Sequence, residues 1–187
     1  MAFRLVETED WRLILSCLVY LQAMFVVYTC STLSHLFTTD FLEGKPQQQF
    51  RRLDQAFIYI MIVATYTPFS AAYLDGVWWW SVLGLMWLIA IAGFVSKVFF
   101  SHRVNSVAIW IYLLLGWLPA ISGMPWSDQM PSHAIWNIVL GGVVYSAGTI
   151  FLLNDRKCWY FHAIWHLFVI AGSLTHFIGI MKVLGEH

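Results

Sequence analysis

Six long apolar blocks constrain most strongly what this chain can fold into. They cover residues 11–37, 55–74, 77–96, 104–122, 134–153 and 159–182. Each block holds roughly the 20 residues that an α-helix needs to cross the hydrocarbon core of a bilayer. The sequence therefore predicts an all-α fold, a polytopic integral membrane bundle of six transmembrane helices, organised as a single domain over residues 1–187.

A large soluble helical bundle is the alternative to a membrane fold. Of the 187 residues, 60% are hydrophobic and 11% are charged, which is far from the composition of an average soluble domain. Helices on the surface of a soluble protein carry a polar face, whereas the stretch WWWSVLGLMWLIAIAGF (78–94) has none. The composition and the pattern both favour the membrane bundle.

The overall charge and the cysteines give no reason to expect a nucleic-acid partner or a structural disulfide. The formal net charge at pH 7 is zero, so the charge balance gives no reason to expect a nucleic-acid partner. The three cysteines, Cys17, Cys30 and Cys158, are odd in number and lack a CxxC spacing. We therefore expect no structural disulfide.

Basic residues are distributed unevenly among the segments that connect the apolar blocks. Because successive spans cross in alternate directions, these segments fall into two sets on opposite sides of the membrane. One set carries seven lysines and arginines and the other three, and such an excess marks the cytoplasmic side. This orientation places both termini outside the cytoplasm. The first set is Lys45, Arg51, Arg52, Lys97, Arg103, Arg156 and Lys157, and the second is Arg4, Arg12 and Lys182.

Four ionisable residues lie at block ends that face the cytoplasmic side in this orientation. His35 is near the end of the first block, Asp54 precedes the second, and His162 and His166 open the sixth. Ionisable groups in hydrocarbon are costly and therefore indicate function. His162 and His166 are four residues apart, so they share one helical face. We predict that the three imidazoles and the carboxylate meet at a similar depth.

Three neutral imidazoles suit zinc, and a catalytic zinc site keeps a fourth position open for water. We predict that His35, His162 and His166 bind Zn²⁺, which lowers the pKa of that water toward neutrality. Asp54 is then a general base or holds the water. Ser31, one helical turn before His35, hydrogen-bonds the water or a substrate carbonyl.

Other interpretations of the same residues remain open. Copper and iron also accept three imidazoles. The histidines and the aspartate can instead hold helices together by interhelical hydrogen bonds, which contribute about 1 kcal/mol or less each, or form a proton relay. Three histidines converging at one depth favour a metal over either of these alternatives.

The remaining histidines are not expected to bind this metal. His176 lies on nearly the same face as His162, but fourteen residues correspond to roughly 21 Å along a helix. His133 and His187 belong to the opposite membrane surface, and His102 lies in a cytoplasmic turn. The sequence thus separates three candidate ligands from four other histidines.

Three ordered motifs resemble a known family: Ser31 with His35 (SxxxH), RRLDQAFIYIMIVATYTPF around Asp54, and HAIWHLFVIAGSLTHF (162–177). The chain resembles, from about residue 17 to 181, the haemolysin III family, bacterial relatives of the progestin and adiponectin receptors. A more distant similarity links it to the superfamily that includes alkaline ceramidases.

The resemblance implies a seven-helix bundle in the bacterial inner membrane, with a cytoplasmic N-terminus and zinc near the cytoplasmic face. The zinc ligands that it implies are His35, His162 and His166, with Ser31 and Asp54 around a zinc-bound water. The first apolar block matches the second helix of the family pattern. We therefore expect the family's first helix to be absent here, which accounts for the N-terminus outside the cytoplasm.

We interpret the chain as a metal-dependent hydrolase of a lipid amide or ester, because acyl chains can reach a site below the membrane surface. The interpretation that the substrate bond is an amide depends on the similarity to ceramidases. One alternative is a lipid-sensing receptor or signalling protein with structural zinc. Another is a membrane-disrupting, haemolytic protein, although the sequence has no polar-lined channel helix and no amphipathic basic segment.

Overall fold

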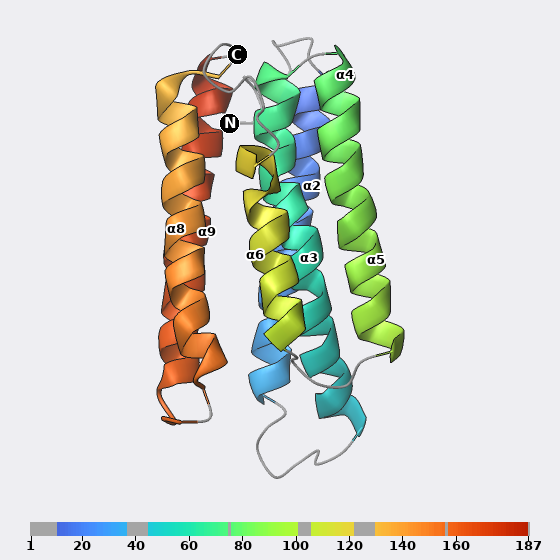
Figure 1. Ribbon diagram of the computed structural model, residues 1–187, viewed down its shortest axis with the longest axis vertical. Coiled ribbons are helices and arrows are strands. Elements are labelled where there is room, and N and C mark those ends of the chain that lie inside the picture. Colours follow the sequence, from blue (N-terminus) through green and yellow to red (C-terminus); the bar gives the residue numbers. More distant parts are fainter. Residues whose placement is uncertain are drawn as a thin grey trace.

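The computed structural model describes residues 11–36, 45–74, 76–100, 106–121, 130–155 and 157–186. Helices dominate this part of the chain and run up and down one long axis (Figure 1). They are α2 (Trp11–Leu36), α3 (Lys45–Tyr73), α4 (Gly76–Trp78), the π-helix η1 (Trp79–Leu83), α5 (Gly84–Phe100), α6 (Ser106–Ile121), α8 (Ser132–Leu153) and α9 (Phe161–Glu186).

Five stretches of helix are long and apolar enough to cross a membrane: α2, Gln49–Tyr73 of α3, Trp80–Phe100 of η1 and α5, α8, and α9. The block 104–122 is the exception, because α6 has 16 residues and its apolar part is Ala108–Ala120. That part is shorter than the roughly 20 residues of a full span. The described residues thus form five candidate spans and one shorter apolar helix, a helical membrane bundle as predicted.

Two helices extend into segments that were predicted to be loops. α3 begins at Lys45, so Arg51 and Arg52 lie in a helix and not in a loop between the first two apolar blocks. Lys97 likewise lies in α5 and not in a turn. Hydropathy marks where a helix leaves the membrane, whereas the backbone hydrogen bonds that maintain it continue through polar residues. The predicted loop residues Arg103 and Arg156 lie outside the described residues.

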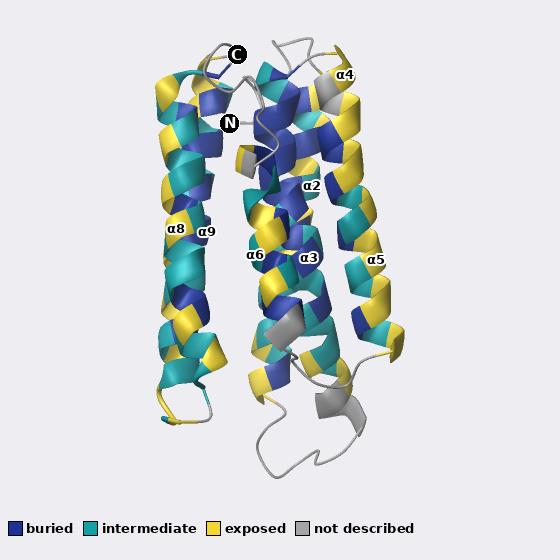
Figure 2. Ribbon diagram, viewed as in Figure 1, coloured by how far each residue is buried: buried dark blue, intermediate teal, exposed yellow. Residues whose placement is uncertain are grey.

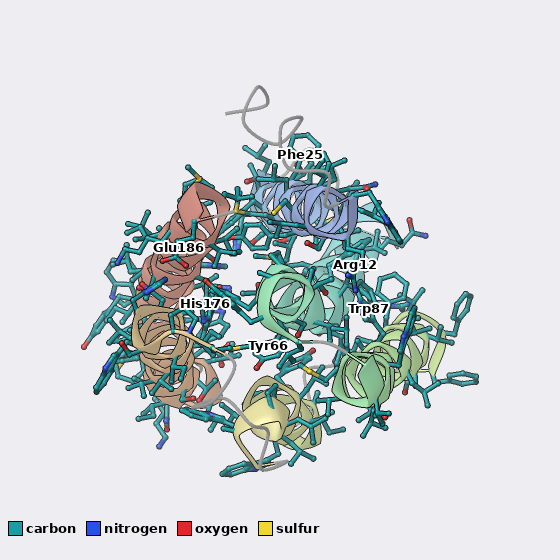
Figure 3. All side chains as sticks on the ribbon, turned by 90° about the horizontal axis from the view of Figure 1, so that it is seen from above. Arg12, Phe25, Tyr66, Trp87, His176 and Glu186 are labelled. Carbon is teal, nitrogen blue, oxygen red and sulfur yellow. The ribbon has the colours of Figure 1, made fainter. Side chains whose placement is uncertain are left out.

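Helix α3 occupies the middle of the bundle. Seen from above, α2, α5, α6 and the α8–α9 pair surround it (Figure 3), and α3 contacts α2, α5, α6 and α9. Its residues include the fully buried Val63, Ala64 and Phe69. Figure 2 shows the burial concentrated along α3 and the exposed residues on the outward faces of the other helices.

The outward faces of the surrounding helices are apolar. Phe25, Trp136 and Leu167 are exposed over 72%, 71% and 65% of their surfaces. In water, an apolar surface of this extent would drive association or aggregation. In a bilayer the same side chains contact lipid, so the exposure pattern agrees with an integral membrane protein.

The three cysteines are free thiols. Cys17 and Cys30 are buried in α2, and Cys158 is partly buried in the turn between α8 and α9. The prediction that the chain has no disulfide is confirmed for all three.

Glycines allow α8 and α9 to approach closely. A Cβ atom added at Gly148 would lie 2.7 Å from the Cβ of Phe168, and one added at Gly172 would lie 2.8 Å from the ring of Tyr145. Small residues at contacts of this kind are typical of helix pairs in membranes, where close packing replaces the hydrophobic effect. The tight pair fixes the position of α9 relative to α8.

We predict that Gly148→Ala lowers the thermal stability of the protein in detergent by about 1–3 kcal/mol, because the new methyl group overpacks a rigid contact. The matched control is Gly84→Ala, since an added Cβ there has no neighbour within 4 Å. Thermal unfolding of both variants provides the measurement. Equal melting temperatures for the two variants would contradict the close packing of α8 and α9.

Candidate metal centre

The three predicted ligands come from two helices that meet at one end of the bundle. His35 lies in the last turn of α2, and His162 and His166 lie in the first two turns of α9. α2 ends and α9 begins at the same end (Figure 1). Because His162 and His166 are four residues apart, both can face α2.

The three imidazoles form a compact group. One ring nitrogen from each lies within 4.8 Å of one from each of the others. The Nε2 atoms of His35 and His166 are 3.1 Å apart. The ring centroids of His162 lie 5.3 Å from those of His35 and 4.8 Å from those of His166. The predicted convergence of these side chains is therefore seen in the structure.

The donor set fits a small metal ion. Two nitrogens bound to tetrahedral zinc at about 2.0–2.1 Å are about 3.3 Å apart, close to the 3.1 Å between the Nε2 atoms of His35 and His166. A direct N–H···N hydrogen bond also explains this single distance. It does not explain why His162 approaches both rings as well.

Asp54 and Ser31 lie close to each other at this end of the bundle. The Ser31 hydroxyl and the Arg51 guanidinium are both polar neighbours of the Asp54 carboxyl. Among the described residues, the group of possible ligands contains the three histidines and no carboxylate. Asp54 is therefore not in the group of possible ligand atoms.

One polar residue near the centre was missed by reasoning from the sequence. The Oδ2 atom of Asp155 lies 3.6 Å from Nδ1 of His162. Asp155 is in the turn that precedes α9, beside the basic residues Arg156 and Lys157. Its spacing of seven residues before His162 was the available signal, but turn residues follow no fixed period.

A cavity of about 140 Å³ lies inside the bundle. The residues that line it include Tyr28, Ile58 and Val169, each within about one helical turn of Ser31, Asp54 or His166. Its wall is mostly apolar, and its volume has room for roughly ten heavy atoms. An apolar chamber thus lies about one helical turn deeper in the bundle than the candidate centre.

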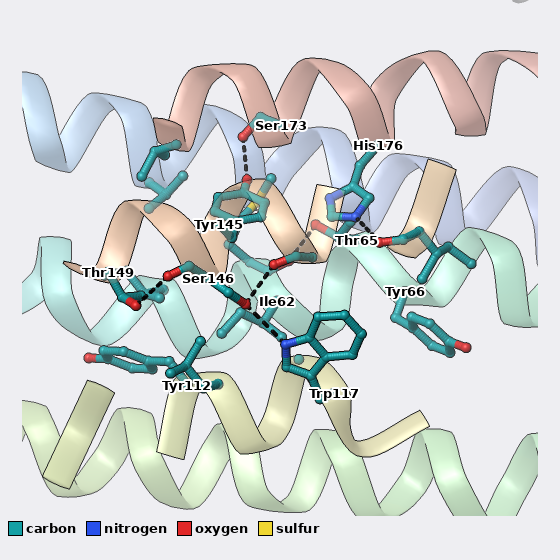
Figure 4. A pocket seen from close by; sticks show the side chains of 18 of the residues that line it. Ile62, Thr65, Tyr66, Tyr112, Trp117, Tyr145, Ser146, Thr149, Ser173 and His176 are labelled. Atoms are coloured by element: carbon teal, nitrogen blue, oxygen red, sulfur yellow. Dashed lines mark hydrogen bonds between the residues drawn. The ribbon is translucent and has the colours of Figure 1, made fainter. Parts of the chain in front are cut away.

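A network of hydroxyl groups crosses one wall of this cavity (Figure 4). Tyr28 of α2 donates a hydrogen bond of 2.8 Å to the Ser173 hydroxyl of α9, and Tyr145 of α8 lies 2.5 Å from the same hydroxyl. His176 stacks on Tyr145 with ring centroids 5.7 Å apart. Three helices are therefore joined by polar contacts deep in the bundle.

His176 and His133 both lie away from the centre, as predicted. Nε2 of His176 faces the backbone carbonyl of Ile138 at 3.3 Å. His133, at the start of α8, is 3.1 Å from Glu186 at the end of α9, which is the opposite end of the bundle. The other two excluded histidines, His102 and His187, lie outside the described residues.

The fold and the site together define an integral membrane helical protein with a group of three histidines near one end. The family model described as "Haemolysin-III related" matches residues 1–177. The chain therefore belongs to the haemolysin-III-related family.

Individual relatives agree with this assignment. The chain is 36% identical over 163 residues to "Hemolysin-3" of Bacillus cereus, which covers 87% of this chain and 72% of that protein. It is 34% identical over 168 residues to the "Hemolysin-3 homolog" of Bacillus subtilis (strain 168), a match that covers 90% of this chain and 76% of that protein. The human "Monocyte to macrophage differentiation factor" is 27% identical over 135 residues, which are 72% of this chain and 56% of that protein. No solved structure matches the chain.

We predict that Ser173→Ala destabilises the protein by about 0.6–2 kcal/mol, because it removes the hydroxyl that joins Tyr28 to Tyr145 across three helices. Thr175→Ala is the control, since the Thr175 hydroxyl bonds only the carbonyl of Ala171 in its own helix. Thermal unfolding in detergent compares the two. A loss of stability in Thr175→Ala as large as that in Ser173→Ala would argue against the interhelical network.

Proposed function

We propose that this protein is a zinc-dependent hydrolase of a lipid amide or ester, with its site near the cytoplasmic face of the bacterial inner membrane. The observation that carries the proposal is the adjacency of two features: three imidazoles grouped at one end of the bundle, and an apolar cavity that begins about one turn deeper. The excess of basic residues at the same end supports the cytoplasmic assignment.

His35, His162 and His166 would hold the zinc ion. Three imidazoles leave a fourth position open, which distinguishes a catalytic site from a closed structural one. When bound, zinc supplies a Lewis acid and makes a hydroxide nucleophile available near neutral pH. Imidazole nitrogens also suit copper, iron and nickel, and zinc is proposed here because three histidines with an open fourth position are a ligand set of catalytic zinc sites.

Asp54 and Ser31 supply proton transfer and orientation. In the proposed reaction a water oxygen bonds to the carbonyl carbon, and Asp54 accepts the water's proton. Ser31 donates a hydrogen bond to the carbonyl oxygen, where negative charge develops. The bond from carbon to the amide nitrogen or ester oxygen then breaks, and the leaving group takes the proton from Asp54. The products are a fatty acid and an amine or an alcohol.

In the proposed reaction the cavity binds part of the acyl chain of the lipid. Room for roughly ten heavy atoms suits part of an acyl chain, and the mostly apolar wall lined by Ile58, Val169 and their neighbours suits its chemistry. A chain seated there would bring its carbonyl group to the histidine end, because the cavity begins beside Ser31 and Asp54. The polar group of the substrate then stays near the membrane surface.

A lipid receptor with structural zinc would need the same histidines and the same cavity. The two functions differ in what they require of Asp54, since a receptor has no proton to transfer. A haemolytic activity gains no support from the hydroxyl groups described above, because those of Tyr28, Tyr145 and Ser173 bond to one another and do not face a water-filled path.

We predict that purified wild-type protein contains close to one zinc ion per chain and that His35→Ala, His162→Ala and His166→Ala each lose most of it. Removal of one imidazole from three leaves too few ligands for tight binding. The matched control is His176→Ala, which should retain its zinc because His176 lies deep in the bundle. Metal analysis measures all four variants. Stoichiometric zinc in a variant that lacks all three histidines would exclude this site.

We predict that Asp54→Asn retains zinc but hydrolyses a fluorescent ceramide analogue roughly 10²-fold more slowly, because the amide cannot accept the proton. Glu186→Gln, a carboxylate substitution at the opposite end of the bundle, should keep the wild-type rate. Zinc content and hydrolysis are measured on the same samples, with an acyl ester as second substrate. An unchanged rate in Asp54→Asn would remove this residue from the mechanism, and binding of the analogue without turnover in wild type would favour the receptor.

A further inference from the structure

The turn between α8 and α9 presents a carboxylate to the histidine group. Oδ2 of Asp155 lies 3.6 Å from Nδ1 of His162, and both side chains are about one-third exposed. Backbone hydrogen bonds brace the turn: the Asp155 N–H donates to the carbonyl of Leu152 at 3.4 Å, and the Lys157 N–H donates to that of Asn154 at 2.9 Å. The main chain that carries the carboxylate is thus held by hydrogen bonds on both sides of it.

We propose that Asp155 is a positioning residue for the metal centre, acting through His162. This inference rests on the proposed zinc site. A carboxylate beside Nδ1 of a neutral imidazole favours the tautomer that carries its proton on Nδ1, which leaves the lone pair on Nε2. The carboxylate also holds the plane of the ring and raises the basicity of the ligating nitrogen.

The contacts of the other two histidines agree with this assignment. His35 and His166 face each other through their Nε2 atoms at 3.1 Å. With Nδ1 of His162 turned toward Asp155, its Nε2 atom is the nitrogen left for the same ion. All three imidazoles then bind through equivalent atoms, and the charge of the ion is partly balanced by a carboxylate that is not itself a ligand.

An ordinary surface ion pair is the competing explanation. Such a pair contributes about 0–1 kcal/mol and requires a protonated His162, whose other charged neighbour is Arg51. A protonated imidazole cannot bind a metal. The two explanations therefore differ in one measurable quantity: a positioning residue changes the affinity for the metal, whereas a surface ion pair does not.

The test measures zinc affinity by chelator competition on the full-length protein in detergent. We expect Asp155→Asn to bind zinc about 10–100-fold more weakly than wild type and Asp155→Glu to recover most of the loss. Lys157→Gln is the matched control, because it changes a charge in the same turn without touching His162, and it should bind zinc as wild type does. The visible spectrum of the Co²⁺-substituted protein should change in Asp155→Asn and be restored in Asp155→Glu.

The outcomes separate this inference from the proposed function. Zinc affinity in Asp155→Asn within twofold of wild type, with an unchanged cobalt spectrum, would overturn the role of Asp155 and leave the zinc site standing. An equal loss of zinc affinity in Lys157→Gln would also overturn the role of Asp155, because zinc binding would then depend on the turn as a whole and not on the carboxylate. A wild-type protein that binds no zinc would overturn both the role of Asp155 and the proposed zinc site. If Asp155→Asn does not fold, Asp155→Gln is compared with Asp155→Glu, which has the same length.

Discussion

The absence of hydrogen-bonding partners in the bilayer interior is the constraint on which the rest of this structure depends. Every backbone amide and carbonyl in hydrocarbon must be bonded within the protein, so the spanning segments are helices. The same requirement applies to side chains. The hydroxyls of Thr65 and Thr67 bond to carbonyls of their own helix, and those of Tyr28, Tyr145 and Ser173 bond to one another. Polar groups that remain together at one end of such a bundle therefore indicate a site.

Helix packing brings that site together within the part of the chain that the structure describes. α2 supplies one histidine and α9 supplies two, while α3, in the middle of the bundle, carries Asp54 beside the Ser31 hydroxyl of α2. The glycines of α8 and α9 hold these two helices close, and the turn that joins them carries Asp155, whose carboxylate lies 3.6 Å from His162. The geometry of the candidate centre therefore depends on how closely α2, α3, α8 and α9 pack against one another.

Apolar blocks and histidine spacing predicted much of this arrangement from the sequence. The blocks predicted the helices, but they missed the start of α3 at Lys45 and the short α6, since hydropathy reports what lies in the membrane and not where a helix ends. The spacing of His162 and His166, together with the shared end of α2 and α9, predicted the histidine group. The contacts of Asp155 and Ser173 were not predictable, because they depend on turn geometry and on the rotation of each helix about its axis.

The central claim is that the three imidazoles bind one zinc ion, and zinc K-edge X-ray absorption on the purified protein tests it most directly. The account predicts nitrogen or oxygen scatterers at about 2.0–2.1 Å, with the outer-shell pattern of three imidazole rings and no sulfur. Cys30, five residues before His35 in α2, and Cys158, four residues before His162, are free thiols. A sulfur scatterer at about 2.3 Å, or a spectrum without imidazole scattering, would contradict the claim.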